Sequence, residues 1–216
     1  VYYLSEAALH GRDILFDQNG KYNLTIRKML ETVYTDYSGN RSDADFVNLE
    51  IYLKRVWFSN GIHHHYAADK FVPGFSSEFF RKALQSVDVN KLPLSEGQTL
   101  DELCDEVFPI IFNPEVMSKR VNQSDGEDLV LTSASNYYRG VTQAEAEEFY
   151  NRMKNPNDSM PVMFGMNSRL VKENGVVQEK VWKSGGLYGQ AIDKIVYWLE
   201  KAEEVAENAS QKSVIQ

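Results

Sequence analysis

The sequence has only one cysteine and no long apolar run. Cys104 cannot form a disulfide within the chain, so cysteine usage gives no sign of an oxidising compartment. Its apolar and acidic neighbours favour a buried, unreactive thiol over a nucleophile, because nearby carboxylates raise the pKa of a thiol. No apolar stretch approaches the roughly 20 residues that span a bilayer, and no signal peptide is recognisable. We therefore expect no membrane segment and a cytoplasmic location, with the periplasm as the alternative.

Positive charge is also in short supply. The 216 residues include 31 Asp and Glu against 23 Lys and Arg, which gives a formal net charge of −8. This balance argues against a general nucleic-acid binder, whose affinity comes from Lys and Arg that neutralise phosphates. Aromatic residues, in contrast, are abundant, with 12 Tyr, 11 Phe and 3 Trp. They exclude a disordered chain, because they supply the buried area that disordered chains lack.

Familiar catalytic motifs are missing as well. No histidine is followed by glutamate, so there is no His-Glu-x-x-His zinc motif, and no Gly-x-Ser-x-Gly nucleophile elbow occurs. The glycine-rich run at 185–189 lacks the Lys-Ser/Thr ending of a phosphate loop and predicts a tight turn. Acidic residues at 145–148 and 203–207 are typical of solvated helix faces. The sequence therefore predicts no catalytic residue and no set of metal ligands.

Helical periodicity dominates the rest of the chain. It predicts helices over 3–16, 24–37, 46–58, 76–87, 99–109, 142–153 and 188–208. Asn23 and Ser76 are expected as N-caps, and capping boxes are expected at Thr99/Glu102 and Thr142/Glu145. In the third helix the side chains expected to face inward are Leu49, Ile51, Leu53, Val56 and Trp57.

Two features limit or interrupt the helices. Pro109 is expected to stop or kink its helix, because proline lacks the backbone donor. Residues 129–138 favour a strand, and Asn174-Gly175 predicts a two-residue hairpin over 169–182. The predicted fold is α+β and helix-dominant, with a small antiparallel sheet. We expect a single domain over 1–216 without an internal boundary.

Residues 59–75 form an irregular loop with three consecutive histidines, His63, His64 and His65. Adjacent side chains point in different directions, whereas metal sites use spacings such as i,i+4 on a helix. A polar loop whose imidazoles form hydrogen bonds is therefore favoured over a metal site, which stays open as an alternative.

The same loop resembles one from a known family. Ser59-Asn60-Gly61-Ile62-His63-His64-His65-Tyr66-Ala67-Ala68-Asp69-Lys70-Phe71-Val72-Pro73 resembles the Ser-Asn…Asn-Tyr…Asp-x-Lys-Phe-Val-Pro loop of dipeptidyl peptidase III. Three other segments agree with the family in order and spacing: Leu4–Ala8, Tyr137–Thr142 with the Glu145-Ala146 that follows, and Leu199–Ala202. The resemblance covers nearly the whole chain and is closest to bacterial members of the Bacteroides type.

The resemblance implies a two-lobed zinc metallopeptidase that removes dipeptides from the N-termini of short peptides. This chain would be the N-terminal part of the lower, non-zinc lobe, which combines helices with a barrel-like sheet. The sequence contains neither the family's His-Glu-x-x-Gly-His motif nor its Glu-Ser-Tyr segment. We therefore expect zinc only in a full-length parent, an inactive isolated chain, and a C-terminal zinc-bearing lobe as its partner.

Carried onto this sequence, the resemblance assigns substrate binding to five loop residues: Asn60, Gly61, His64, His65 and Tyr66. An aromatic ring with neighbouring donors suits an extended peptide. For Tyr66 a second interpretation stays open, in which the ring only packs the loop down. Two other functions also stay open: a non-catalytic helical module that binds a protein or peptide, and a histidine-based metal binder.

Overall fold

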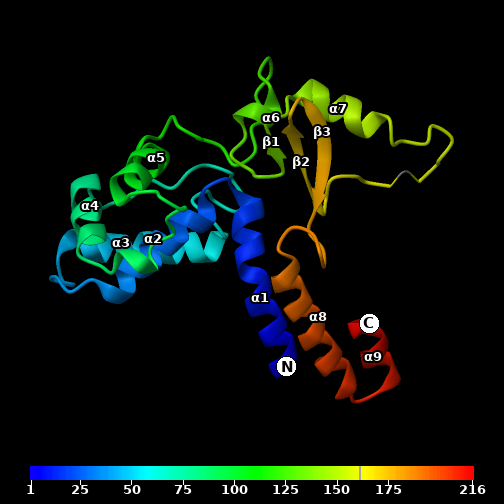
Figure 1. The fold of residues 1–216 in the computed structure, drawn as a ribbon, viewed down its shortest axis with the longest axis horizontal. Helices are drawn as coiled ribbons and strands as arrows, with labels where there is room; N and C mark the ends of the chain where they lie inside the picture. Colours follow the sequence, from blue (N-terminus) through cyan, green and yellow to red (C-terminus); the bar gives the residue numbers. More distant parts are fainter. Residues whose placement is uncertain (161) are drawn as a thin grey trace. The chain divides into compact units, whose positions relative to one another are not determined.

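A computed structural model describes residues 1–160 and 162–216 (Figure 1). The helices in chain order are α1 (Tyr2–Asn19), α2 (Asn23–Asp36), α3 (Ala44–Ser59), α4 (Ser77–Gln85), the 3-10 turn η1 (Val89–Lys91), α5 (Leu100–Phe112), α6 (Leu129–Thr132), α7 (Gln143–Asn151), α8 (Gly189–Glu204) and α9 (Ala209–Ile215). The strands are β1 (Tyr138–Arg139), β2 (Ser168–Glu173) and β3 (Val176–Val181). The predicted helix-dominant α+β fold is confirmed.

The chain packs as two compact units, which are described separately. The helical unit comprises residues 16–136, and the sheet unit comprises 1–15 with 137–216. Division into packing units does not by itself make separate domains, so the single domain over 1–216 stays a prediction. None of the described helices is both long enough and apolar enough to cross a bilayer.

The helical unit surrounds one apolar core. Helices α2 and α3 pack along each other, and α4 packs on both α2 and α5. Fully buried side chains from each helix fill the centre: Ile26, Met29, Leu30, Val33, Leu49, Leu53, Val56, Phe80, Leu84, Val107 and Ile111. Cys104 belongs to this core, and burial raises the pKa of its thiol. The predicted burial of this thiol is thus confirmed.

Local capping signals were predicted correctly in most places. Ser76 accepts a hydrogen bond from the Phe79 amide, and Thr99 and Glu102 form a reciprocal capping box. Asn23 is an exception: it is the first residue of α2, and its buried side chain accepts the Ile62 amide at 3.2 Å. A long-range partner therefore replaces the expected local one.

Pro109 neither stops α5 nor lies at its end. The helix continues to Phe112. Proline removes one backbone hydrogen bond from a helix, but the buried side chains of Ile110 and Ile111 hold the last turn against the core. The expected helix stop at this position is wrong because tertiary packing outweighs the lost hydrogen bond.

The sheet unit contains a three-stranded sheet in the order β1-β2-β3. Strands β2 and β3 form the predicted antiparallel hairpin, and Asn174 and Gly175 have φ values of 51° and 80°, both positive as a type I′ turn requires. The sheet is mixed rather than antiparallel, because β1 pairs with β2 in parallel, with Tyr138 opposite Leu170.

Several predicted boundaries shift. Only the end of the expected strand 129–138 is extended, because Asp128 caps a short helix by accepting the amides of Val130 and Leu131. The capping box of Thr142 and Glu145 is confirmed, but α7 ends at Asn151. The last predicted helix, 188–208, corresponds to α8, which ends at Glu204, and α9 follows it beyond the predicted range.

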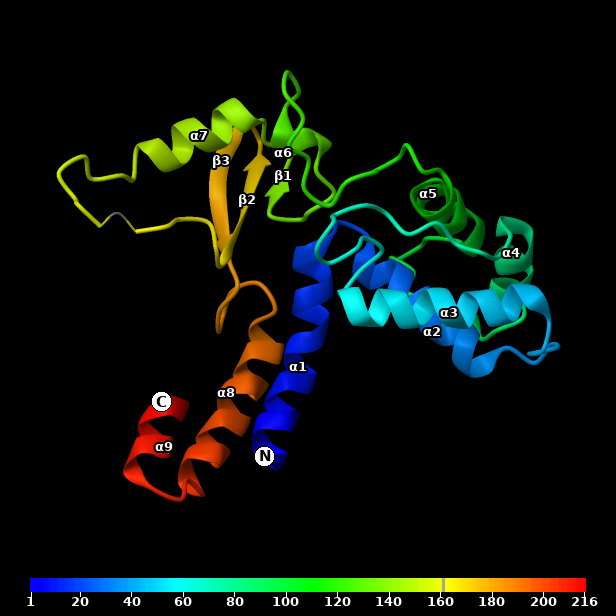
Figure 2. The same ribbon diagram turned by 180° about the vertical axis from the view of Figure 1, so that it is seen from behind.

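Helices α1 and α8 lie side by side in the sheet unit (Figures 1 and 2). Gly11 faces α8, since a Cβ at this position would lie in van der Waals contact with Ile195 Cδ1, at 3.7 Å. The rings of Tyr3 and Trp198 stack with centroids 5.9 Å apart. These contacts lie along the helix pair, and the aromatic rings meet at the N-terminal end of α1.

Candidate functional site

The loop that carries the predicted site residues starts at the C-terminus of α3; residues 59–71 are called the histidine loop below. Asn60 adopts a left-handed conformation, with a φ of 53°, and its amide bonds to Trp57 O. Gly61 has a φ of 155°, and a Cβ there would lie 2.1 Å from Asn23 Nδ2. Asn19 Nδ2 donates to the carbonyls of Ser59 and Asn60, both at 3.0 Å. Asn60 and Gly61 therefore turn the chain out of α3, and their backbone sets the path of the loop.

Beyond this turn the histidine loop folds back on itself as a narrow hairpin. The Phe71 amide donates to Ile62 O at 2.8 Å, and the His64 amide donates to Asp69 O at 2.7 Å. The tip closes with a bond from the Ala68 amide to His64 O at 3.0 Å, and Ala68 has a φ of 61°. A following segment borders the hairpin, since the Arg120 amide donates to Ala68 O at 2.9 Å.

Two lysines anchor the loop to residues 110–119. Lys70 Nζ donates to three carbonyl oxygens at and after the end of α5, those of Ile110, Asn113 and Val116. Burial lowers the pKa of Lys70. Lys119 forms an ion pair with Asp69, and its hydrogen bond lowers the pKa of that carboxyl group. The tip of the loop is thus held in place before any ligand arrives.

His63 belongs to the scaffold of the loop. Its side chain is 1% exposed, and Nε2 lies 2.7 Å from Met117 O. Because a carbonyl oxygen can only accept, Nε2 carries the proton. Burial lowers the pKa of His63 to about 4, so the ring is neutral at pH 7. This neutral, inward ring holds the loop to the segment that contains Met117.

His64 and His65 form the outer wall of the loop. Their rings stack with centroids 4.8 Å apart and planes 17° from parallel. His64 Nδ1 accepts the amides of Tyr66 and Ala67, at 3.2 and 3.1 Å, while His65 Nδ1 pairs with Ser59 Oγ at 3.3 Å. Each of the three histidine rings therefore has its own partner, as expected for a polar loop.

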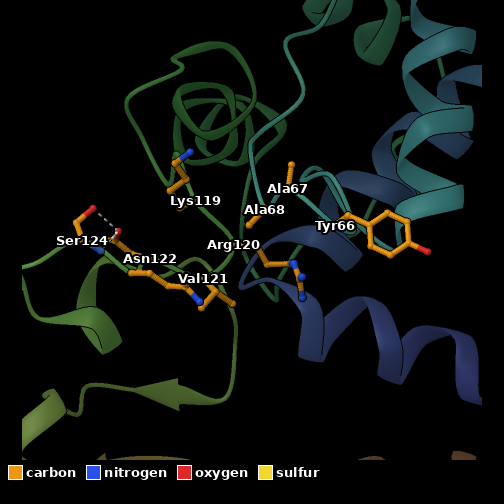
Figure 3. A pocket seen from close by; sticks show the side chains of 9 residues that line it. Tyr66, Ala67, Ala68, Lys119, Arg120, Val121, Asn122 and Ser124 are labelled. Atoms are coloured by element: carbon orange, nitrogen blue, oxygen red, sulfur yellow. Dashed lines mark hydrogen bonds between the residues drawn. The ribbon is translucent and has the colours of Figure 1, made fainter.

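Tyr66 projects from the tip of the loop. Its side chain is 87% exposed, and its ring contacts are with His65 and His64, at centroid distances of 4.3 and 6.3 Å. Figure 3 shows the ring pointing away from the segment that contains Arg120. Such exposure leaves most of the ring available to a ligand, which favours a contact role over a packing role.

A polar hollow of about 510 Å³ lies on one side of the loop tip (Figure 3). It is lined by Tyr66, Ala67, Ala68 and residues 119–124. Its guanidinium group is already engaged: Arg120 donates to Asn19 Oδ1 and to His65 O, both at 3.2 Å. This hollow places hydrogen-bonding groups next to the loop tip that carries Tyr66.

An apolar hollow of about 630 Å³ lies on the other side of the loop. It is lined by Ile51, Lys54, Arg55, Phe58, Ser59, His64, His65 and Phe71. Its helical part is a stripe on α3 at positions i, i+4 and i+7, namely Ile51, Arg55 and Phe58. The prediction that Ile51 and Trp57 face inward is wrong, since they are 44% and 38% exposed. Ile51 borders this hollow, and Trp57 Nε1 donates to Glu31 at 2.8 Å.

Neither a protein-family model nor a curated protein matches this chain. The likeness to dipeptidyl peptidase III therefore rests on the residues quoted above.

The zinc that this likeness implies for a complete enzyme does not fit the side chains present here. Among the described residues, no three or more His, Cys, Asp or Glu side chains are placed to hold one metal ion. His63 faces inward to Met117 O, while His64 and His65 are turned to separate hydrogen-bond partners. The arrangement is suited to contacting a ligand, because the histidine loop presents aromatic rings and hydrogen-bonding groups at a surface edge held in place by its own hydrogen bonds.

The rings of His64, His65 and Tyr66 lie against one another, but the sequence did not indicate which other residues border them. Arg55 and Phe58 on α3 border the same surface as the histidines. One sequence signal could have found them: Ile51, Arg55 and Phe58 are spaced i, i+4 and i+7, so they lie on one face of the helix.

Proposed function

We propose that this chain is the peptide-binding part of a zinc-dependent exopeptidase similar to dipeptidyl peptidase III, which removes dipeptides from the N-termini of short peptides. The observation that carries the proposal is the Tyr66 ring, 87% exposed on a loop that is anchored to residues 110–119. This ring contacts His65, which in turn contacts the exposed Phe58, so the three rings form one contiguous surface patch, and such patches mark binding sites.

A peptide suits this edge better than a compact ligand. A polar hollow lies on one side of the loop tip and an apolar hollow on the other, so an extended chain can reach both. Aromatic rings supply area, and backbone amides and carbonyls supply hydrogen bonds. Because the loop is already ordered by its own hydrogen bonds, little conformational entropy is lost when the peptide binds.

The proposal assigns the chemistry and the zinc to a separate lobe, with which this chain would form a cleft. It places no catalytic residue and no metal ligand in 1–216. On this account the chain by itself binds short peptides and does not cleave them. The proposed location is the cytoplasm, with which the single buried Cys104 is compatible, and fractionation of the source cells would test it.

Amide chemical shifts of the labelled chain, titrated with a tetrapeptide that has a free amino terminus, would test the binding proposal. We expect the largest changes at residues 59–71 and 119–124. Changes confined to the sheet unit, or none at millimolar peptide, would contradict it. A poly-glycine peptide of equal length serves as the control, because it lacks the side chains that the apolar hollow accepts.

A non-catalytic helical module that binds peptides is the second candidate, and the two hollows beside the histidine loop suit it equally well. The sequence of the parent gene distinguishes the two functions. A His-Glu-x-x-Gly-His motif downstream in the parent reading frame, together with release of dipeptides by the parent protein, would support the exopeptidase. A parent protein with neither would support the binding module.

A further inference from the structure

The apolar hollow has a chemically mixed character. Its floor includes Ile51 and Phe58, which are 44% and 73% exposed. The His65 ring stands edge-on to Phe58, with centroids 5.0 Å apart and planes 76° from parallel. Two cations on the same helix, Lys54 and Arg55, also line the hollow. An apolar floor with a cationic rim suits a ligand that joins an apolar group to an anion.

Arg55 differs from the other cations of the helical unit. Throughout residues 16–136, all of which the structure describes, it is the one lysine or arginine whose side chain makes no hydrogen bond, ion pair or ring contact. Lys54, one position earlier, is held by Glu50 at 2.6 Å. A chain with a net charge of −8 has many carboxylates to offer, yet none is placed on Arg55. Its guanidinium group is therefore available to an external anion.

We propose that this hollow binds the last residue of a short peptide, with the apolar side chain on Ile51 and Phe58 and the terminal carboxylate on Arg55. This inference rests on the proposed peptide-binding function. A C-terminal residue carries its carboxylate on the same carbon as its side chain. One residue can therefore place an apolar side chain on the floor of the hollow and a carboxylate at its cationic rim. The guanidinium fork matches a carboxylate in two parallel hydrogen bonds. An internal Asp or Glu would bring the charge without the apolar group.

The test compares ligands that differ only in the terminal charge. N-acetyl-phenylalanine and its carboxamide probe the hollow alone, and the tetrapeptide Ala-Ala-Ala-Phe as free acid and as C-terminal amide probes the whole edge. We expect each acid to bind about fivefold more tightly than its amide, near the upper value for an exposed ion pair. The Arg55→Gln variant should remove that difference. Arg152→Gln, which makes the same charge change in the sheet unit, should preserve it.

The outcomes separate this inference from the proposed function. Equal binding of acid and amide, or an unchanged preference in Arg55→Gln with an intact thermal transition, would overturn the inference, while tetrapeptide binding that weakens in Tyr66→Ala would still uphold the function. Binding of N-acetyl-phenylalanine through Arg55 without tetrapeptide binding would uphold recognition at the hollow and contradict the function. A dimer in sedimentation that Phe58→Ala dissociates would assign the hollow to a second copy and overturn the inference.

Discussion

The side chain of Asn23 occupies the place where a side chain at position 61 would begin. A Cβ on Gly61 would lie 2.1 Å from Asn23 Nδ2, and the φ of Gly61 is 155°. The same Asn23 side chain accepts the Ile62 amide at 3.2 Å. This pair therefore fixes the exit of the chain from α3, and with it the position of the histidine loop.

Gly61→Ala should destabilise the protein strongly. It adds backbone strain and a clash with a buried side chain, so we expect a loss of about 3 kcal/mol in the free energy of unfolding. Gly97→Ala is the matched control, because Gly97 also has a positive φ, 76°, but nothing lies within 4 Å of its Cβ position. There the loss should be about 1 kcal/mol. Urea denaturation of both variants measures the difference, and equal losses would contradict the clash.

Acid should destabilise the protein through His63. Its folded pKa is about 4 and its ordinary value is 6.5, so the unfolded chain takes up a proton in a pH range where the folded chain does not. Stability is therefore lost as the pH falls through this range, by about 2 kcal/mol between pH 7 and pH 5.

His63→Gln checks the origin of that loss. Glutamine keeps an N–H group to donate to Met117 O but does not titrate. Urea denaturation at pH 7, 6 and 5 should show a clearly smaller loss in the variant than in the wild type. Parallel pH dependences of the two proteins would mean that other groups cause the loss.

Lys70→Met should loosen the histidine loop. The ammonium group donates to the carbonyls of Ile110, Asn113 and Val116, and its removal leaves these oxygens without that donor. We expect a loss of about 2 kcal/mol. Lys82→Met is the control, because its ion pair with Glu78 on α4 is exposed to solvent and its loss should change the stability far less. Amide hydrogen exchange should also accelerate at residues 62–71 in Lys70→Met only; unchanged protection there would refute the anchoring role.

Zinc should not bind tightly to the chain. Structural zinc sites need four ligands and catalytic sites three plus water, whereas His63, His64 and His65 are held in separate hydrogen bonds. Calorimetric titration of a tag-free sample at pH 7 should give no one-to-one submicromolar binding. A tight site lost in His64→Ala would show that the histidines rearrange to hold a metal.

Local signals in the sequence predicted much of the fold. Thr99 with Glu102, Thr142 with Glu145, and Asn174-Gly175 act within four residues, and each was predicted correctly. Pro109 and β1 could not be predicted in this way. The first is decided by packing in the core, and the second pairs in parallel with a strand some 30 residues later.

In the candidate site, too, local features were predictable and features set by tertiary packing were not. The motif around Tyr66 marked the loop, but the hollow depends on which face of α3 is left uncovered. Helical periodicity alone placed Ile51 inward, although only the face with Leu49, Leu53 and Val56 meets the core. Arg55 could not be singled out from the sequence, because its lack of side-chain partners depends on where the carboxylates lie in the folded unit.

The most direct test of the account is the affinity of Tyr66→Ala for a short peptide. We expect a loss of about 1–2 kcal/mol, which is a Kd raised about 5- to 30-fold, with an unchanged Tm because the ring is 87% exposed. In a complete parent enzyme the same change should raise KM more than it lowers kcat. Tyr2→Ala, which removes another exposed ring in the sheet unit, should leave peptide affinity unchanged. An unchanged affinity in Tyr66→Ala together with a lowered Tm would make Tyr66 a packing residue and contradict the account.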